Sequence, residues 1–174
     1  MVNYIFISGV HGSGKSTLSR RINQEINIDY TSVSDLIRSG GKLINPDNKA
    51  TIEINKNQIL WKNELNNINN KQNLILLDGH FCLLNKEHKI EVLPEDIFDD
   101  TNMIKIVLVT NTPEIIFSRL QKRDDKKYSI DLLKDFIAME EKQAYLLSQS
   151  KKIPLFIYNE NEPFDELLNF LTEI

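Results

Sequence analysis

The 174-residue sequence contains little of what marks secreted or membrane proteins. Cys82 is its one cysteine, so no disulfide can form within the chain, and a reducing compartment is expected. No apolar run approaches the roughly 18 residues that a membrane span needs. The N-terminus runs straight into a strand-like segment and lacks the regions of a signal peptide. We therefore expect a cytoplasmic protein that has no membrane partner.

Positive charge is also in short supply. The 21 lysines and arginines are outnumbered by 25 aspartates and glutamates, which gives a net charge of −4. A general nucleic-acid binder normally carries a basic surplus, so this balance argues against that class, although a local basic patch stays open. A hydrophobic fraction of 41% and this length suit one globular domain, so residues 1–174 are read as a single domain.

What the sequence does have is an alternation of strand-like and helix-like segments, which indicates a parallel sheet covered by helices. Strands are predicted at residues 4–8, 28–33, 73–78, 103–110 and 153–158. Helices are predicted at residues 15–25, 34–39, 57–70, 112–122 and 130–150, and near the C-terminus. In the third of these, the candidate buried positions are Ile59, Leu60, Leu65 and Ile68. Residues 83–100 are read as a connection with one short helix near Pro94. The predicted fold class is α/β, a five-stranded parallel sheet with helices on both faces.

Residues 9–17 read Gly-Val-His-Gly-Ser-Gly-Lys-Ser-Thr, directly after the first predicted strand and leading into the first predicted helix. This is the phosphate-binding loop pattern (Walker A) in the context that it requires. Gly9 and Gly14 permit backbone angles that side chains forbid, and Gly12 keeps the loop slim. Backbone N–H groups of such a loop face anionic oxygens. The pattern predicts that the chain binds the phosphates of ATP or a close relative.

Side chains of the loop have separate parts in this chemistry. Lys15 is placed to reach the β- and γ-phosphates, and the Ser16 hydroxyl to bind Mg²⁺. Thr17 can offer its hydroxyl or N–H near the α-phosphate. The predicted nucleotide-binding residues of the loop are therefore Gly12, Ser13, Gly14, Lys15, Ser16 and Thr17.

The third predicted strand ends in Asp78-Gly79-His80. A carboxylate at the end of a buried strand beside the first strand is where the Mg²⁺ shell needs an anion. Asp78 is therefore predicted to share the metal with Ser16, and the alternative is an aspartate that caps a turn before glycine. His80 is a candidate substrate ligand, or else a hydrogen-bonded loop histidine.

Three arginines are further candidates. Arg119 and Arg123 share one face of a predicted helix, and cations stabilise the charge of a phosphoryl group in transfer. The alternative is an exposed basic helix end, which is itself common. Arg38, three residues after Asp35, could make a bidentate contact with an acceptor phosphate, or be a surface arginine.

Taken together, these motifs resemble the nucleoside monophosphate kinases, and most of all the archaeal-type adenylate kinases and the related eukaryotic nuclear adenylate kinase. Residues 34–38 look like that family's Gly-Asp-Leu-x-Arg motif, with serine in place of glycine. Residues 78–80 match its Asp-x-His, and residues 119–123 its Arg-Leu-x-x-Arg before a short lid. The segment after Arg38 matches no pattern of the family.

The resemblance implies a P-loop NTPase fold with an acceptor-binding segment at about residues 34–58 and a lid at about residues 122–131. It implies transfer from ATP, with Mg²⁺ as cofactor, to a nucleoside monophosphate, AMP first of all. We expect a monomer or a weak dimer. In this reading the catalytic residues are Lys15, Asp78, Arg119 and Arg123, the last of which also binds the nucleotide, and the substrate-binding residues are Asp35, Arg38 and His80.

Two other functions stay open on the sequence. One is a kinase of a small-molecule or nucleic-acid hydroxyl group, such as a metabolite or a 5′-hydroxyl end. The other is a regulatory or assembly ATPase, whose nucleotide state controls a protein or RNA partner.

Overall fold

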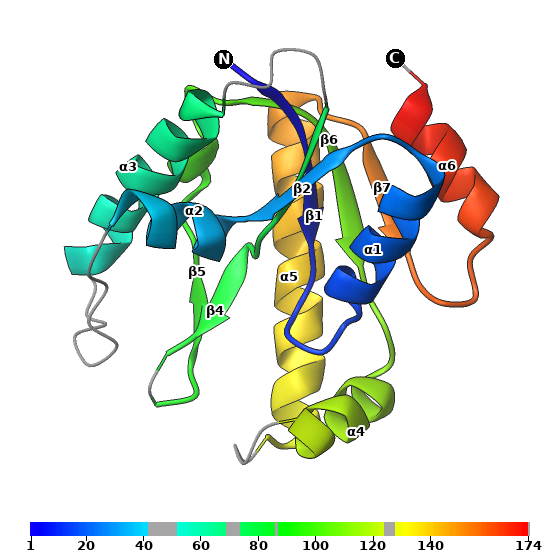
Figure 1. Ribbon diagram of the computed structural model, residues 1–174. Coiled ribbons are helices and arrows are strands. Elements are labelled where there is room, and N and C mark those ends of the chain that lie inside the picture. Colours follow the sequence, from blue (N-terminus) through cyan, green and yellow to red (C-terminus); the bar gives the residue numbers. More distant parts are fainter. Residues whose placement is uncertain (42–51, 69–73, 86, 124–127, 174) are drawn as a thin grey trace.

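Five short strands pair into one parallel sheet in the computed structural model (Figure 1), which describes residues 1–41, 52–68, 74–85, 87–123 and 128–173. The strand order is β2-β3-β1-β6-β7. The strands are β1 (Asn3–Ser8), β2 (Asp29–Ser32), β3 (Ile75–Asp78), β6 (Asn102–Val109) and β7 (Leu155–Tyr158). With helices on both faces of this sheet, the predicted fold class is confirmed.

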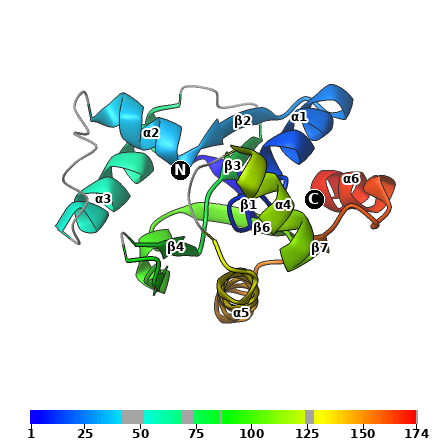
Figure 2. The same ribbon diagram turned by 90° about the horizontal axis from the view of Figure 1, so that it is seen from below.

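Successive side chains of a strand point to opposite faces, so β1 contributes to two cores. Ile5 and Ile7 face the layer formed by α1 (Lys15–Glu25) and α6 (Phe164–Thr172). Tyr4 and Phe6 face the layer that holds α3 (Ile52–Asn67), α4 (Pro113–Arg123) and α5 (Ile130–Lys151). Figure 2 shows α5 on the side of the sheet opposite to α1.

The short helix α2 (Val33–Gly40) follows β2 directly and packs against α3. Its N-terminus is capped by Ser32, whose hydroxyl accepts a hydrogen bond from the backbone N–H of Asp35. Such a cap contributes about 1 kcal/mol, which helps a helix of eight residues to form. The cap fixes where the chain turns from the sheet edge into α2.

The stretch that we read as a connection contains a hairpin, so that prediction was incomplete. β4 (Cys82–Leu84) and β5 (Ile90–Val92) pair in antiparallel fashion, and the 3₁₀ helix η1 (Glu95–Phe98) follows at Pro94 as expected. Strands of three residues are too short to show a period of two in the sequence. The hairpin lies beside α5.

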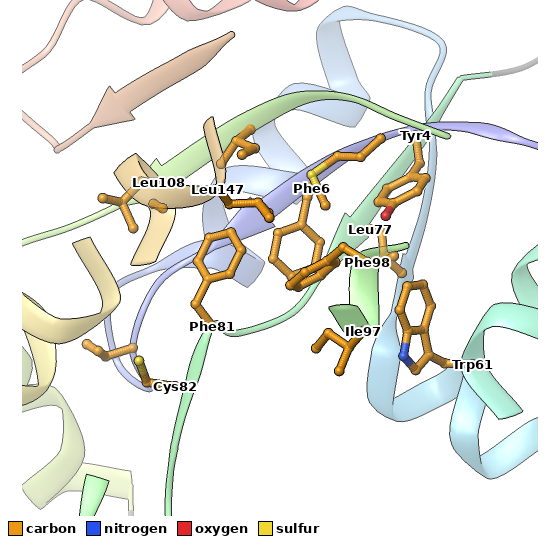
Figure 3. Close-up of a cluster of buried hydrophobic side chains, with 14 of the residues drawn as sticks. Tyr4, Phe6, Trp61, Leu77, Phe81, Cys82, Ile97, Phe98, Leu108 and Leu147 are labelled. Carbon is orange, nitrogen blue, oxygen red and sulfur yellow. The ribbon is translucent and has the colours of Figure 1, made fainter. Parts of the chain in front are cut away.

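The core on the α5 side is rich in aromatic rings (Figure 3). Trp61 of α3 is 1% exposed and lies near Phe98, whereas Ile59, which we expected to be buried, is 61% exposed. Leu65 is buried as expected. The predicted helix began too late, because α3 starts at Ile52. None of the helices in the described ranges combines the length and apolar character needed to cross a membrane.

Candidate functional site

The phosphate loop connects the end of β1 to the start of α1, at the edge of the sheet where the parallel strands have their carboxyl ends. Gly9 and Gly14 have φ angles of 143° and 111°, which side chains rarely allow. A Cβ on Gly9 would lie 2.2 Å from the carbonyl oxygen of Val109. The loop can therefore keep this shape only with glycine at its start.

The side chain of Lys15 is buried at the centre of the site. Its Nζ donates to the carbonyl oxygen of Gly9 at 2.5 Å and lies 3.2 Å from His80 Nε2 and 3.7 Å from Asp78 Oδ1. Burial lowers the pKa of Lys15, and the negative charges of Asp78 and Glu140 oppose this shift. The structure thus brings together Lys15, Asp78 and His80, three of the residues that the sequence singled out.

His80 is held in its neutral form. Burial, the charge of Lys15 and the neighbouring His11 ring together keep the pKa of His80 well below its usual value. Because an ammonium group can only donate, Nε2 of His80 accepts from Lys15 and the ring proton lies on Nδ1. The Nε2 lone pair therefore points toward the phosphate-binding end of the site.

Tyr30, which no sequence motif singled out, holds Asp78. The Tyr30 hydroxyl donates to Asp78 Oδ2 at 3.0 Å and also hydrogen-bonds to Ser16. Burial raises the pKa of Asp78, opposed first by Lys15 and then by Tyr30. Burial and the Asp78 charge raise the pKa of Tyr30 to about 12, so the phenol keeps its proton. The two residues predicted for the metal, Ser16 and Asp78, are thereby linked through one tyrosine.

The donor set at this point suits Mg²⁺. Ser16 and Asp78 supply a hydroxyl and a carboxylate that line the same cavity, and Mg²⁺ prefers oxygen ligands. Among the described residues, no group of three or more histidine, cysteine or acidic side chains could hold a metal ion by itself. A site with one or two protein ligands, completed by phosphates and water, is the usual arrangement for Mg²⁺ in phosphotransferases.

Arg119 and Arg123, at the end of α4, both line the cavity beside the loop. Nη1 of Arg119 donates to the carbonyl oxygens of Gly12 and Ser13, at 3.3 and 3.1 Å, and Nη2 pairs with Glu160. Arg123 is exposed, and its positive charge reaches Lys15. The shared helical face that the sequence predicted thus points toward the phosphate loop, and Glu160 is an addition that the sequence did not reveal.

Asp35 and Arg38 occupy a different place. They form an ion pair with each other at 3.0 Å, with side chains 53% and 68% exposed. Neither is among the residues that line the cavity, to which α2 contributes Val33, Ser34 and Ile37 instead. Their predicted role in acceptor binding stays a prediction. Residues 42–51 of the acceptor segment and residues 124–127 of the lid lie outside the described ranges.

Glu140, on the buried side of α5, was also missed from the sequence. It is 1% exposed, and its carboxylate accepts from the backbone N–H groups of Gly9, Phe81 and Cys82 at 2.7–3.1 Å. Burial raises the pKa of Glu140, while these hydrogen bonds and the charge of Lys15 act in the opposite direction. One carboxylate thereby fastens α5 to both the phosphate loop and the turn after Asp78.

These residues surround a cavity of about 670 Å³, within the range of small-molecule sites. The cationic end lies at the loop, α1 and α4, and its positive side chains are Lys15, Arg20, Arg119 and Arg123. The apolar end lies between α2, α3, the hairpin and η1, and its side chains include Phe6, Val33, Ile37, Trp61, Leu83, Leu93, Ile97 and Phe98. Asp78 and His80 lie where the two ends meet. A second cavity of about 100 Å³ lies behind the loop and is lined by Thr17, Arg21 and Tyr158, among others.

Comparison with solved structures finds the same fold in small-molecule kinases. A shikimate kinase from Acinetobacter baumannii, in complex with shikimate, aligns over 98% of this chain and 91% of its own, with a TM-score of 0.62 and 13% identity. A shikimate kinase from Bacteroides thetaiotaomicron aligns over 97% and 95%, with a TM-score of 0.54 and 21% identity. A gluconokinase from Sinorhizobium meliloti 1021 aligns over 96% and 87%, with a TM-score of 0.50 and 13% identity. At identities this low, the structural similarity establishes the fold and leaves the substrate open.

Comparison at the level of sequence gives the family. The search of curated proteins found no match. Residues 8–136, from the end of β1 into α5, match the family AAA_17, which is described as an AAA domain. The narrower resemblance to archaeal-type adenylate kinases stays a hypothesis. Because the match covers more than half of the sequence, the chain belongs to the AAA_17 family of AAA domains, with the fold of the P-loop kinases.

Proposed function

We propose that this protein transfers the γ-phosphoryl group of Mg²⁺-bound ATP to a hydroxyl group of a small molecule held in the apolar end of the cavity. The observation that carries this proposal is the two-ended cavity itself. Its cationic end suits a triphosphate, and its apolar end offers separate room for an acceptor. The fold shared with kinases of shikimate and gluconate supports the same class of reaction.

On the donor side, the backbone N–H groups of the loop and the Lys15 ammonium would bind the phosphates. The smaller cavity behind the loop, with Arg21 and Tyr158, is adjacent, and at about 100 Å³ it could take only part of the nucleoside. Ser16 and Asp78 would hold Mg²⁺, whose charge helps to neutralise the phosphate oxygens. Arg119 and Arg123 add positive charge at the point where the phosphoryl group is transferred.

On the acceptor side, the hydroxyl group would approach the junction at His80. The acceptor oxygen forms a bond to the γ-phosphorus while the bond to the leaving oxygen of ADP breaks. The hydroxyl proton passes to an oxygen of the transferred phosphoryl group, because Nε2 of His80 already accepts from Lys15 and its lowered pKa makes the ring a poor base. No covalent intermediate is needed, since positioning and charge stabilisation carry most of this chemistry.

A nucleoside monophosphate, AMP first, is the second candidate acceptor. It rests on the resemblance of residues 34–38, 78–80 and 119–123 to adenylate kinases, and on α2 forming beside the cavity as that family requires. We rank it second because Arg38, the cation assigned to the acceptor phosphate, pairs with Asp35 away from the cavity lining.

A direct assay separates these functions. ADP release from Mg²⁺-ATP is followed with a panel of neutral alcohols, nucleosides, sugar acids, shikimate and nucleoside monophosphates, and products are identified by mass spectrometry. We expect a phosphorylated product from one hydroxyl compound, and its loss in Lys15→Met but not in Lys89→Met, an exposed lysine of the hairpin region. ATP turnover that no acceptor alters would overturn the proposal and favour a partner-controlled ATPase.

A further inference from the structure

Arg119 and Glu160 form an ion pair that lies over the phosphate loop. Nη2 of Arg119 pairs with Oε1 of Glu160, while Nη1 donates to the carbonyl oxygens of Gly12 and Ser13 at 3.3 and 3.1 Å. A Cβ on Gly14 would lie 3.4 Å from Nη1 of Arg119 and 4.0 Å from Oε1 of Glu160. The pair therefore stands next to Gly14, the N-cap residue of α1.

The carboxylate of Glu160 lies where a phosphate group is also attracted. Gly14 precedes the first turn of α1, and the free N–H groups and the macrodipole at a helix N-terminus favour negative charge. Arg119 adds a full positive charge beside this helix end. Carboxylate and phosphate oxygens make the same kind of charge-assisted hydrogen bond to a guanidinium group. The groups that hold Glu160 can therefore hold a phosphate instead.

Glu160 also lies between the two cavities. Gly14, Thr17 and Glu160 line both the larger cavity and the smaller cavity behind the loop. A donor whose phosphates lie at the loop and whose nucleoside enters the smaller cavity has to pass these three residues. Its phosphates then come close to the carboxylate of Glu160, and like charges repel one another at such distances.

The two partners of the ion pair are held with different firmness. Arg119 makes two further hydrogen bonds to the loop, and 34% of its side chain is exposed. The backbone around Glu160 is fixed by a turn, in which the N–H groups of Asn161 and Glu162 donate to Asn159. The side chain of Glu160 is 58% exposed, so it can rotate into solvent. When the pair opens, Arg119 stays on the loop and the Glu160 side chain moves away.

We propose that Glu160 regulates donor binding by competing with the donor's phosphates for Arg119, an inference that rests on the donor site of the function proposed above. Nη2 of Arg119 exchanges the carboxylate of Glu160 for an oxygen of the triphosphate, while Nη1 keeps its bonds to the loop. No covalent bond changes in this exchange. Each binding event opens one ion pair, so the affinity for the donor is lower than the loop and Arg119 would give without Glu160.

Glu160→Gln tests the competition, because the amide oxygen can still accept from Arg119 but carries no charge. Glu162→Gln removes one negative charge from the same turn, at a residue outside both cavity linings, and is the matched control. The Kd values for Mg²⁺-ATP and for inorganic tripolyphosphate are measured by calorimetry. We expect Glu160→Gln to lower both values at least about threefold, the scale of one exposed ion pair, and Glu162→Gln to leave them near wild type. An unchanged or higher Kd in Glu160→Gln would overturn the inference.

A double substitution separates competition for Arg119 from a general effect of charge. In an Arg119→Gln protein, the carboxylate of Glu160 has no guanidinium group to occupy. Adding Glu160→Gln to this protein should therefore lower the Kd for tripolyphosphate by a smaller factor than it does when Arg119 is present. The same factor in both backgrounds would overturn the competition and reduce Glu160 to an unspecific negative charge.

Tripolyphosphate has no nucleoside and its binding needs no acceptor, so this measurement does not depend on phosphotransfer. Tighter binding in Glu160→Gln would support the competition even if no hydroxyl compound were phosphorylated. A phosphorylated product together with unchanged Kd values would leave the kinase function standing and overturn the role of Glu160. If neither ligand bound to the wild-type protein or to any variant, the donor site and this inference would both be wrong.

Discussion

Tyr30 connects Ser16 and Asp78, the two residues that the sequence assigned to the metal. A substitution of this one side chain therefore tests the predicted metal site. Its hydroxyl donates to Asp78 and so favours the ionised carboxylate, against the burial that raises the pKa of Asp78. Tyr30→Phe should raise that pKa further, so the acid limb of the kcat–pH profile should move to higher pH. The loss of one hydrogen bond to a charged group should lower kcat about tenfold near neutral pH.

Tyr145→Phe, an exposed tyrosine of α5, is the matched control and should change neither quantity. An unshifted acid limb in Tyr30→Phe would mean that Asp78 does not need to be ionised for activity.

Residues of the site differed in how well the sequence predicted them. Lys15, Ser16 and Asp78 stand in short contiguous motifs whose spacing is set by the phosphates and the metal, so their convergence could be predicted. Glu140 acts on the loop from more than a hundred residues away, and Glu160 reaches it through Arg119. A distant contact of this kind leaves no spacing in the sequence, and a single glutamate in a helix is normally read as exposed.

At the scale of elements, α5 is fixed to the site through Glu140. The carboxylate takes N–H donors from Gly9, Phe81 and Cys82, so it sets where the loop begins and where the hairpin departs. Glu140→Gln keeps the shape but offers one oxygen, and its NH₂ group would face N–H donors. We expect a loss of about 1–3 kcal/mol in the free energy of unfolding, measured by urea denaturation.

If Glu140 had only a structural role, its substitution would change stability alone. Nucleotide binding is therefore the second measurement. Measured by calorimetry well below the melting temperature, the Kd for ATP should rise in Glu140→Gln because the Gly9 end of the loop is no longer held. Glu141→Gln, the next residue of α5, should leave both quantities near their wild-type values. An unchanged Kd in a destabilised Glu140→Gln protein would limit Glu140 to a role in folding.

Elements also show why part of the fold escaped prediction. All five strands of the sheet were predicted, and four of them are mainly apolar runs between helical segments, as is usual for buried parallel strands, whereas β2 is largely polar. The β4–β5 hairpin was missed because its strands have only three residues each and β5 contains a glutamate. The buried face of α3 was also predicted wrongly, because Trp61, not Ile59, contacts the core.

The whole molecule arranges a phosphate site and an apolar pocket around the carboxyl ends of one parallel sheet. Helices α1 and α4 bring the cations, and α2, α3 and the hairpin form the apolar walls. In the proposed reaction, the acceptor and the donor phosphates would meet at the junction of Asp78 and His80. The proposed activity then requires the positive charges of α4 to act on the phosphates at this junction.

The two arginines of α4 should divide this task. Arg119 is bound to the carbonyl groups of Gly12 and Ser13 and to Glu160, so it supports the loop before the reaction begins. Arg119→Ala should therefore raise the Kd for ATP. Arg123 is exposed at the helix end and lines the cavity, where it can meet the charge that develops during transfer. Arg123→Ala should lower kcat by about 10²–10³-fold, the scale for one preorganised donor, with little change in the Kd for ATP.

Coupled kinetics and calorimetry on each single variant separate the two effects. Lys122→Ala removes the neighbouring charge of the same helix end, outside the cavity lining, and should leave both quantities unchanged. If Arg123→Ala retained the wild-type kcat, its charge would belong to an exposed helix end, where the macrodipole alone accounts for a basic residue. If instead Arg119→Ala lowered kcat and left the Kd for ATP unchanged, the roles of the two arginines would be reversed. The bonds of Arg119 to the loop argue against that reversal, because a side chain already held by two carbonyl groups and a carboxylate is set before the nucleotide arrives.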